Sequence, residues 1–157
     1  MISGTKRSPA AVGSAAGTGV GSALGTMPEW DLSDLYPDPK SPKVVTDIAE
    51  ARSRSKDLKD RYQGKIAGLG RDGAALAEAV AAYESLSDLI GRLGSYAGLL
   101  YAADTADPDR AKFYGDIQEQ ITVISSDLLF FELELNKIDD ADLAAALEVP
   151  ALAKYKP

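Results

Sequence analysis

Apolar residues recur every three or four positions along three long stretches of this chain, which is the spacing of one face of an α-helix. The stretches span residues 41–63, 72–104 and 107–137. Ser55 interrupts the first apolar row, and none of the stretches alternates as a strand does. The pattern predicts an all-α fold with core rows of Val44, Ile48, Ala51, Leu58 and Tyr62; Leu76, Ala79, Tyr83, Leu86, Ile90, Leu93, Ala97 and Leu100; and Tyr114, Ile117, Ile121, Ile124, Leu128, Phe131, Leu135 and Ile138.

Helix-start signals stand at the head of each stretch. A side chain that can accept from free backbone N–H groups is followed, in two cases, by a proline at the first helical position. These signals are Ser41 with Pro42, Asp72, and Asp107 with Pro108.

The connections between the stretches predict how the helices are arranged. Gly64 ends the first helix, and residues 65–71 are expected to form a loop. The short turn 103–107 joins two helices of about 45 Å each, so we expect them to pack as a long antiparallel hairpin. A short amphipathic helix is predicted from Asp139 or Asp140 to Leu147, and a further turn at residues 151–155.

The first 40 residues divide into a tail and a strap. Residues 1–26 are rich in Gly, Ser and Ala, so we expect a disordered tail, and they lack the compact apolar segment of a signal peptide. Residues 27–40 contain three prolines and predict an extended strap. Trp30 is expected to fill a pocket between helices, with Leu32, Leu35 and Tyr36 as further anchors. Residues 41–157 then form the helical domain.

Gly91, Gly94 and Gly98 lie on one face of the second predicted helix. Each glycine costs about 0.5–1 kcal/mol relative to alanine inside a helix. We expect another helix to approach closely along this face and offset that cost. A local kink at Gly91–Gly94 and a ligand pocket are the alternatives.

Composition narrows the class of protein. The chain has 157 residues with a net charge of −7, and the only charged residues of the tail are Lys6 and Arg7, so the helical part is strongly acidic. This charge disfavours nucleic-acid binding. No apolar run approaches the ~20 residues of a membrane-spanning helix. The absence of cysteine fits a reducing compartment, and we expect a cytoplasmic protein.

The chain contains neither histidine nor cysteine. His/Cys zinc sites, Ser-His-Asp triads and Cys-His dyads are therefore excluded from it. Asp127, Glu132 and Glu134 are predicted to form a solvated acidic face, because a di-iron carboxylate site also needs histidine. Four tyrosines are expected to pack in the core with their hydroxyls at polar edges, namely Tyr83, Tyr96, Tyr101 and Tyr114. We identify no catalytic residue and no metal ligand.

Three stretches of the sequence resemble oligoendopeptidase F, a bacterial member of the thimet-oligopeptidase-like zinc peptidases. The first is Glu29-Trp-Asp-Leu-Ser-Asp-Leu-Tyr-Pro37. The second runs from Gly91 to Thr105 and is followed by Ala111–Gly115, and the third runs from Ser126 to Ile138. Their order and separation are also similar to the family, and together they cover nearly everything except the tail.

The resemblance implies the N-terminal helical region of a larger helical peptidase, where it helps to wall a substrate channel. The family binds zinc with a His-Glu-x-x-His helix and a downstream glutamate, and the glutamate between the histidines is the general base. None of these residues occurs here. We therefore expect a chain truncated before its catalytic domain and inactive alone, whose partners are the rest of the parent peptidase and, in the full-length zinc enzyme, an oligopeptide substrate. The alternative is a non-enzymatic helical scaffold or protein-interaction module.

We predict that the isolated chain neither binds zinc stoichiometrically nor hydrolyses peptides, because it lacks imidazole and thiolate ligands. Competition with a chromophoric chelator measures the zinc, and a quenched fluorescent peptide measures hydrolysis. Tight binding of one zinc ion per chain would contradict this reading of the sequence.

Overall fold

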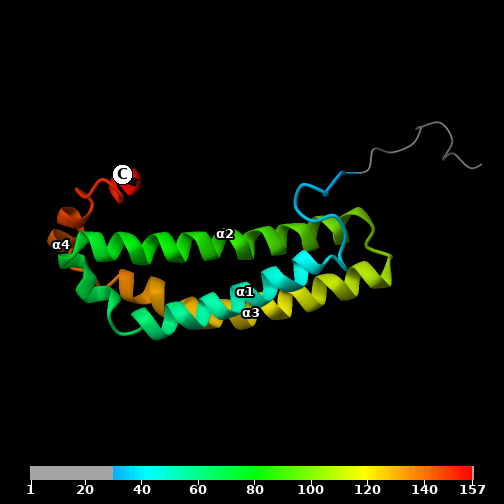
Figure 1. Cartoon of the computed structure of the whole chain (residues 1–157), viewed down its shortest axis with the longest axis horizontal. Coiled ribbons are helices and arrows are strands. Elements are labelled where there is room, and N and C mark those ends of the chain that lie inside the picture. Colours follow the sequence, from blue (N-terminus) through cyan, green and yellow to red (C-terminus); the bar gives the residue numbers. More distant parts are fainter. Residues whose placement is uncertain (1–29, 157) are drawn as a thin grey trace, which may run out of the picture.

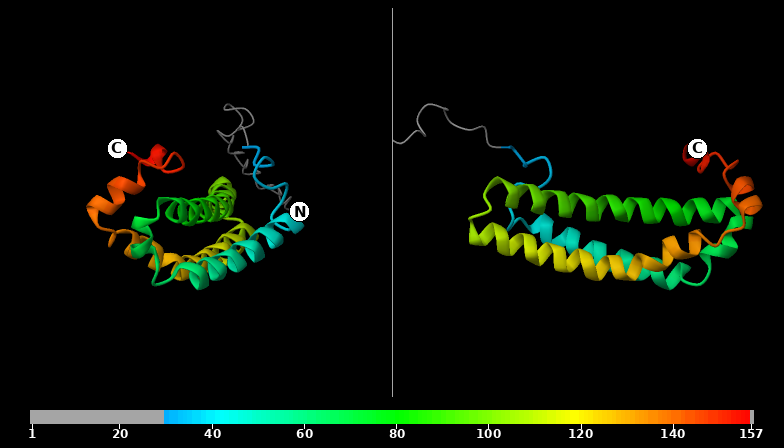
Figure 2. Two further views of the ribbon diagram at one scale, coloured as in Figure 1. Left: turned by 60° about the vertical axis from the view of Figure 1, so that its left-hand side comes forward. Right: turned by 180° about the vertical axis from the view of Figure 1, so that it is seen from behind.

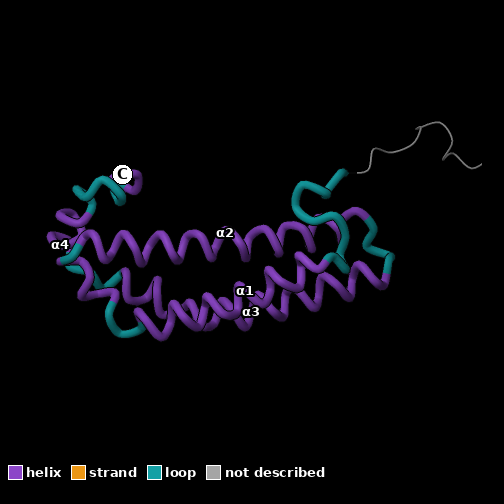
Figure 3. The backbone as a smooth tube through the Cα atoms, in the orientation of Figure 1, coloured by secondary structure: helices purple, strands orange, loops and turns teal. Residues whose placement is uncertain are grey.

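The computed structural model describes residues 30–156, which form helices and turns and contain no strand (Figures 1 and 3). The long helices are α1 (Pro42–Tyr62), α2 (Gly73–Ala103) and α3 (Pro108–Leu135), followed by the short α4 (Asp140–Ala146). Two 3₁₀-helices, η2 (Ile66–Arg71) and η3 (Ala153–Tyr155), complete the fold. The all-α prediction is confirmed, and the predicted tail of residues 1–26 lies outside the described residues.

The helix starts are where the capping signals predicted them. In each case a side-chain oxygen of the N-cap residue accepts from backbone N–H groups of the first turn, which would otherwise lack a partner. The acceptors are Ser41, 3.2 Å from the Lys43 nitrogen; Asp72, 3.0 Å from Ala75; Asp107, 2.8 Å from Asp109; and Asp139, 2.9 Å from Ala141.

The three long helices pack side by side, with α2 and α3 as an antiparallel hairpin and α1 alongside both (Figures 1 and 2). Val44, Leu93, Ala97 and Ile117 of the predicted rows pack with Tyr36 in a second cluster, whereas other members of the rows lie in the shared core. This shared core consists of Ala51 and Leu58 of α1, Ala79, Leu86 and Leu89 of α2, and Ile124, Leu128, Phe130 and Phe131 of α3, with Ile66 of η2. These side chains are nearly inaccessible to solvent, so burial of the three facing stripes stabilises the bundle.

The segment predicted as a loop at residues 65–71 is instead η2, and a carboxylate from α3 holds it. Gly64 has φ = +80°, a conformation that suits glycine and ends α1 as predicted. Glu134 of α3 then accepts from the backbone nitrogens of Gly64 at 2.7 Å and Ile66 at 3.1 Å. Ile66 is fully buried, so the turn brings an apolar side chain into the core that periodicity did not reveal.

The N-terminal strap is turned rather than extended, because the backbone nitrogens of Leu35 and Tyr36 both donate to the carbonyl of Leu32. Tyr36 is 1% exposed and contacts Tyr96 of α2 edge to face, so it is the anchor of this segment. The prediction that Trp30 fills a pocket between helices is wrong. Within the described residues, its side chain is 67% exposed.

The strap and the C-terminal segment lie at opposite ends of the bundle (Figures 1 and 2). At the C-terminal end, Leu76 of α2 packs with Ile138, Ala146 and Leu152 in a small separate core. Gly73, at the first turn of α2, allows this approach, because a Cβ atom there would lie 2.6 Å from a methyl carbon of Val149. The segment after α3 therefore folds back against the start of α2.

The three glycines predicted to lie on one face of α2, Gly91, Gly94 and Gly98, do not share one environment. A Cβ atom on Gly94 would lie 3.1 Å from Cδ1 of Ile121, so a side chain of α3 packs tightly against this glycine. At Gly98 the nearest atom, from Tyr114, would be 3.9 Å away, an ordinary contact. At Gly91 no atom lies within 4 Å, so the prediction of a close neighbour is wrong at this position in the described chain.

We predict that Gly91→Ala stabilises the chain and that Gly94→Leu destabilises it. Alanine at Gly91 meets open space and gains about 0.5–1 kcal/mol of helix propensity. Leucine at Gly94 must displace Ile121, and overpacking of this kind costs about 1–3 kcal/mol. Urea unfolding followed by circular dichroism gives both shifts. Stabilisation by Gly94→Leu would show that α2 and α3 are not closely packed there.

Candidate functional site

One side of the contact between α2 and α3 is left open. Helix α1 covers the other side, where its Ala51 and Leu58 join the core. The open side carries two adjoining hollows, with volumes of about 590 Å³ and 370 Å³, and no lining residue of either belongs to α1. The two hollows share Tyr83, Ser87 and Glu132, so they form one elongated depression, which we call the seam groove.

Most of the wall that α2 contributes to the seam groove is one row of side chains, beside which lie Glu84 and Ile90. Successive members are three or four residues apart, so they follow one face of the helix. The row changes from large apolar side chains near α4 to small ones toward the middle of the bundle. Its members are Leu76, Val80, Tyr83, Ser87 and Gly91.

The opposite wall comes from α3, and α4 with the C-terminal segment closes one end. Phe131, Glu132 and Leu135 face the larger hollow, and Ser125, Leu128 and Leu129 face the smaller one. Leu129 is 59% exposed. The closed end is lined by Leu143, Leu147, Leu152 and Tyr155.

Besides Ser87, Ser125 and Asn136, the polar side chains of the seam groove are acidic or are tyrosines bonded to acids. Tyr83 stacks on Phe131 with ring centres 4.3 Å apart, and its hydroxyl donates to Glu132 at 2.7 Å. Burial, together with this carboxylate, raises the pKa of Tyr83. Glu84 accepts from Lys154 and from the Tyr155 hydroxyl, each at 2.8 Å. These two hydrogen bonds lower the pKa of Glu84 and hold η3 against α2.

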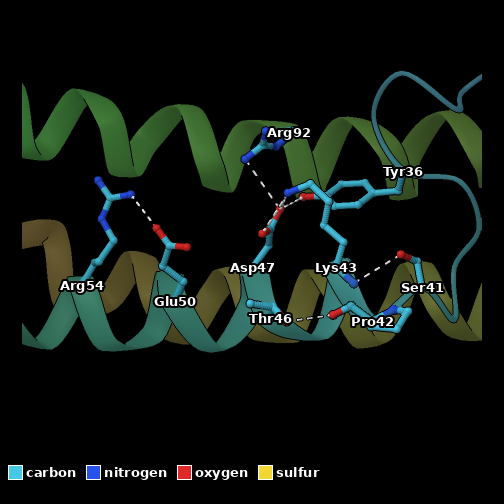
Figure 4. Close-up of polar contacts among 9 residues, drawn as sticks. All are labelled: Tyr36, Ser41, Pro42, Lys43, Thr46, Asp47, Glu50, Arg54 and Arg92. Carbon is cyan, nitrogen blue, oxygen red and sulfur yellow. Dashed lines mark hydrogen bonds and ion pairs between the residues drawn. The ribbon is translucent and has the colours of Figure 1, made fainter.

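A buried carboxylate, Asp47, forms a second polar constellation between the strap, α1 and α2 (Figure 4). It is 5% exposed. The Tyr36 hydroxyl donates to it at 2.7 Å and the Lys43 ammonium at 3.0 Å, and the Arg92 guanidinium lies 3.6 Å away. The charge of Asp47 is thus neutralised by partners from three parts of the chain, as a buried carboxylate requires.

The pKa shifts in this cluster have opposing causes. Burial alone would raise the pKa of Asp47, but hydrogen bonds from Tyr36 and Lys43 and the charges of Lys43 and Arg92 hold it below its usual value. Burial, reinforced by the hydrogen bond to Asp47, raises the pKa of Tyr36 to about 12. Tyr36 and Lys43 are therefore both hydrogen-bonded to Asp47, which is the arrangement of a structural tie rather than of an acid or base that exchanges protons.

Sequence periodicity missed this cluster although the signal was present. The buried residues of α1 are Val44, Asp47, Ala51, Ser55 and Leu58, which keep the helical spacing without interruption. Ser55, read as a break, is 1% exposed and donates to the carbonyl of Arg52 at 3.0 Å. Asp47 is a polar residue at a core position of this row, and that position is the sequence signal by which it could have been identified.

The carboxylates predicted to form a solvated acidic face on α3 are exposed or partly exposed, and each of them also has a structural partner. Asp127 pairs with Lys59 of α1 at 2.7 Å. Glu132 accepts from Tyr83, and Glu134 accepts from the turn that follows α1. These residues therefore tie α3 to its neighbours.

No group of three or more His, Cys, Asp or Glu side chains within residues 30–156 is placed to hold a metal ion. In the same part of the chain, no helix is long and apolar enough to cross a bilayer. No family model, curated protein or solved structure matches this chain. The seam groove, an elongated apolar depression with a few polar groups, is the candidate functional site.

We predict that the Asp47→Asn substitution destabilises the chain at pH 7 by about 1–3 kcal/mol, since it leaves Lys43 and Arg92 without their buried partner. The pKa of Asp47 is lower in the folded state than the value of about 3.9 in the unfolded state. Its ionised form therefore stabilises the fold at pH values above the unfolded pKa, and this contribution is lost as the pH falls through the folded pKa. The difference between Asp47→Asn and wild type should therefore shrink below about pH 4.

Urea unfolding at several pH values between neutral and acid measures this difference. The exposed Asp60 of α1 is the matched control, and Asp60→Asn should change stability little at any pH. A loss of stability in Asp47→Asn that is the same at acid and neutral pH would mean that the charge of Asp47 does not stabilise the fold.

Proposed function

We propose that this chain is the N-terminal helical region of a zinc-dependent oligoendopeptidase that hydrolyses short peptides. Two lines of support come together. The three sequence stretches named above resemble that family, and the region they resemble is a helical wall rather than a catalytic centre. The observation that carries the proposal is the seam groove, an apolar depression on one side of a helical bundle that a further part of the enzyme can cover.

The residues of this chain do not fit a zinc site. Histidine and cysteine are absent from the sequence, and the acidic side chains of residues 30–156 are not gathered in groups of three or more. We therefore assign no step of peptide hydrolysis to any residue here. The proposed contribution of the chain is a rigid wall, and the rest of the parent peptidase supplies zinc, the general base and contacts to an oligopeptide substrate.

A non-enzymatic helical interaction module is the second candidate. The same open groove favours it, because an uncovered apolar depression also suits a separate protein partner. The two candidates differ in where the covering polypeptide is encoded. In a peptidase it follows this region in the same reading frame, whereas an interaction module finds it on another chain.

We expect the coding DNA after codon 157 to continue in frame to a His-Glu-x-x-His motif, and the full product to cleave a quenched fluorescent peptide in a zinc-dependent manner. The matched control is the full product with both motif histidines changed to alanine, which should lose zinc and activity together. A reading frame without any zinc-binding motif would reject the peptidase and leave the interaction module.

A further inference from the structure

The seam groove has the geometry of a missing helix position in a bundle. Two antiparallel helices with a third on one side of their contact leave an equivalent position on the other side, which a fourth helix occupies in four-helix bundles. The α2 wall presents Val80, Tyr83, Ser87 and Gly91 at spacings of three or four. Side chains at this spacing form a helix face against which another helix can pack. The shape therefore favours a helix over a small molecule or an extended peptide.

Small residues at the inner end of the seam groove allow a close approach. Ser87 and Gly91 lie one turn apart on α2, and Ser125 faces them from α3. A Cβ atom on Gly91 would meet no atom within 4 Å, so the glycine is not needed by any contact in residues 30–156. A helix seated in the groove gives this costly residue a physical reason, because only glycine lets two helix backbones come together there.

The charge of the seam groove indicates the chemistry of that helix. Its ionisable lining residues, tyrosines apart, are Glu84, Glu132 and Asp140, and no lysine or arginine is among them. Lys154 already pairs with Glu84, so an incoming helix meets the charges of Glu132 and Asp140. An apolar stripe flanked by lysine or arginine is the complementary surface.

The proposed function indicates where that helix comes from. In the proposed parent enzyme the catalytic region follows this one in the same polypeptide, and Leu152 and Tyr155, which lie late in the described residues, line the seam groove. A segment tethered near these residues has a high effective concentration at the groove. A second copy of this chain, in contrast, brings a net charge of −7 toward an acidic rim.

We infer that the seam groove binds an amphipathic helix with basic flanks from the region that follows residue 157 in the parent peptidase. The inference rests on the proposed function and deepens it by naming the surface that joins the two regions. It also assigns Gly91 as a docking residue.

The test uses the 157-residue chain and a labelled synthetic helix of about 18 residues, roughly 27 Å long, with a leucine stripe and lysine flanks. Fluorescence anisotropy measures its binding. We expect Gly91→Leu to weaken binding at least about tenfold while raising the denaturation midpoint, since leucine fills the seam but is the better helix former. Gly115→Leu is the matched control, because Gly115 also has open space around it but lies outside the groove, and it should bind as wild type does.

Charge is tested separately, so that the result does not depend on one substitution. A probe with glutamate flanks should bind about tenfold more weakly than the lysine probe. Asp140→Lys, at an exposed position, should narrow that gap. Equal effects of Gly91→Leu and Gly115→Leu, or equal binding of the two probes, would overturn the inference. So would a chain dimer in sedimentation that Gly91→Leu dissolves, because the occupant would then be a second copy.

The source of the helix is tested with a peptide of the first amphipathic helix encoded after codon 157. It should displace the lysine probe from wild type and bind poorly to Gly91→Leu. Failure to displace the probe, in a parent that does carry a zinc motif, would overturn this inference and leave the proposed function standing. Absence of the zinc motif would overturn both.

Discussion

The structure depends on a packing constraint: α1 can cover only one of the two sides of the contact between α2 and α3. On the covered side, Ala51 and Leu58 complete a core with Leu86 and Phe131. On the other side, α4 and η3 close one end and leave the remainder open. Apolar side chains of α2 and α3 extend beyond the core that α1 covers, and they form the walls of the seam groove.

Charged residues fix how the helices are placed around this core. Asp47 joins the strap, α1 and α2 through Tyr36 and Arg92, and Glu134 joins α3 to the turn after α1. Such buried or half-buried pairs contribute little net stability, but they leave an unpaired charge when the packing is wrong. In this arrangement of the three helices, each of these carboxylates has a partner on a neighbouring element.

The helices were predictable because each boundary is decided by local chemistry. Ser41, Asp72 and Asp107 cap their own helices, and the apolar spacing repeats within each helix. The failures concern interactions between distant residues. Trp30 was expected in a pocket because it is large and apolar, and Asp47 was overlooked because its partners Tyr36 and Arg92 come from other elements. The seam groove was likewise invisible, because periodicity shows which side of a helix is apolar but not which neighbour covers it.

The openness of the groove can be measured directly, because the chain contains no cysteine. A cysteine at Ser87, on the groove wall, and one at Ser55, in the α1 contact, give two single-thiol variants whose reaction rates with a thiol reagent can be compared. We expect the reaction rate of Ser87→Cys to be within about tenfold of the rate of a cysteine in an unfolded peptide, and the rate of Ser55→Cys to be far lower. Equal protection of both thiols in the folded monomer would show that the groove is closed and would contradict the account.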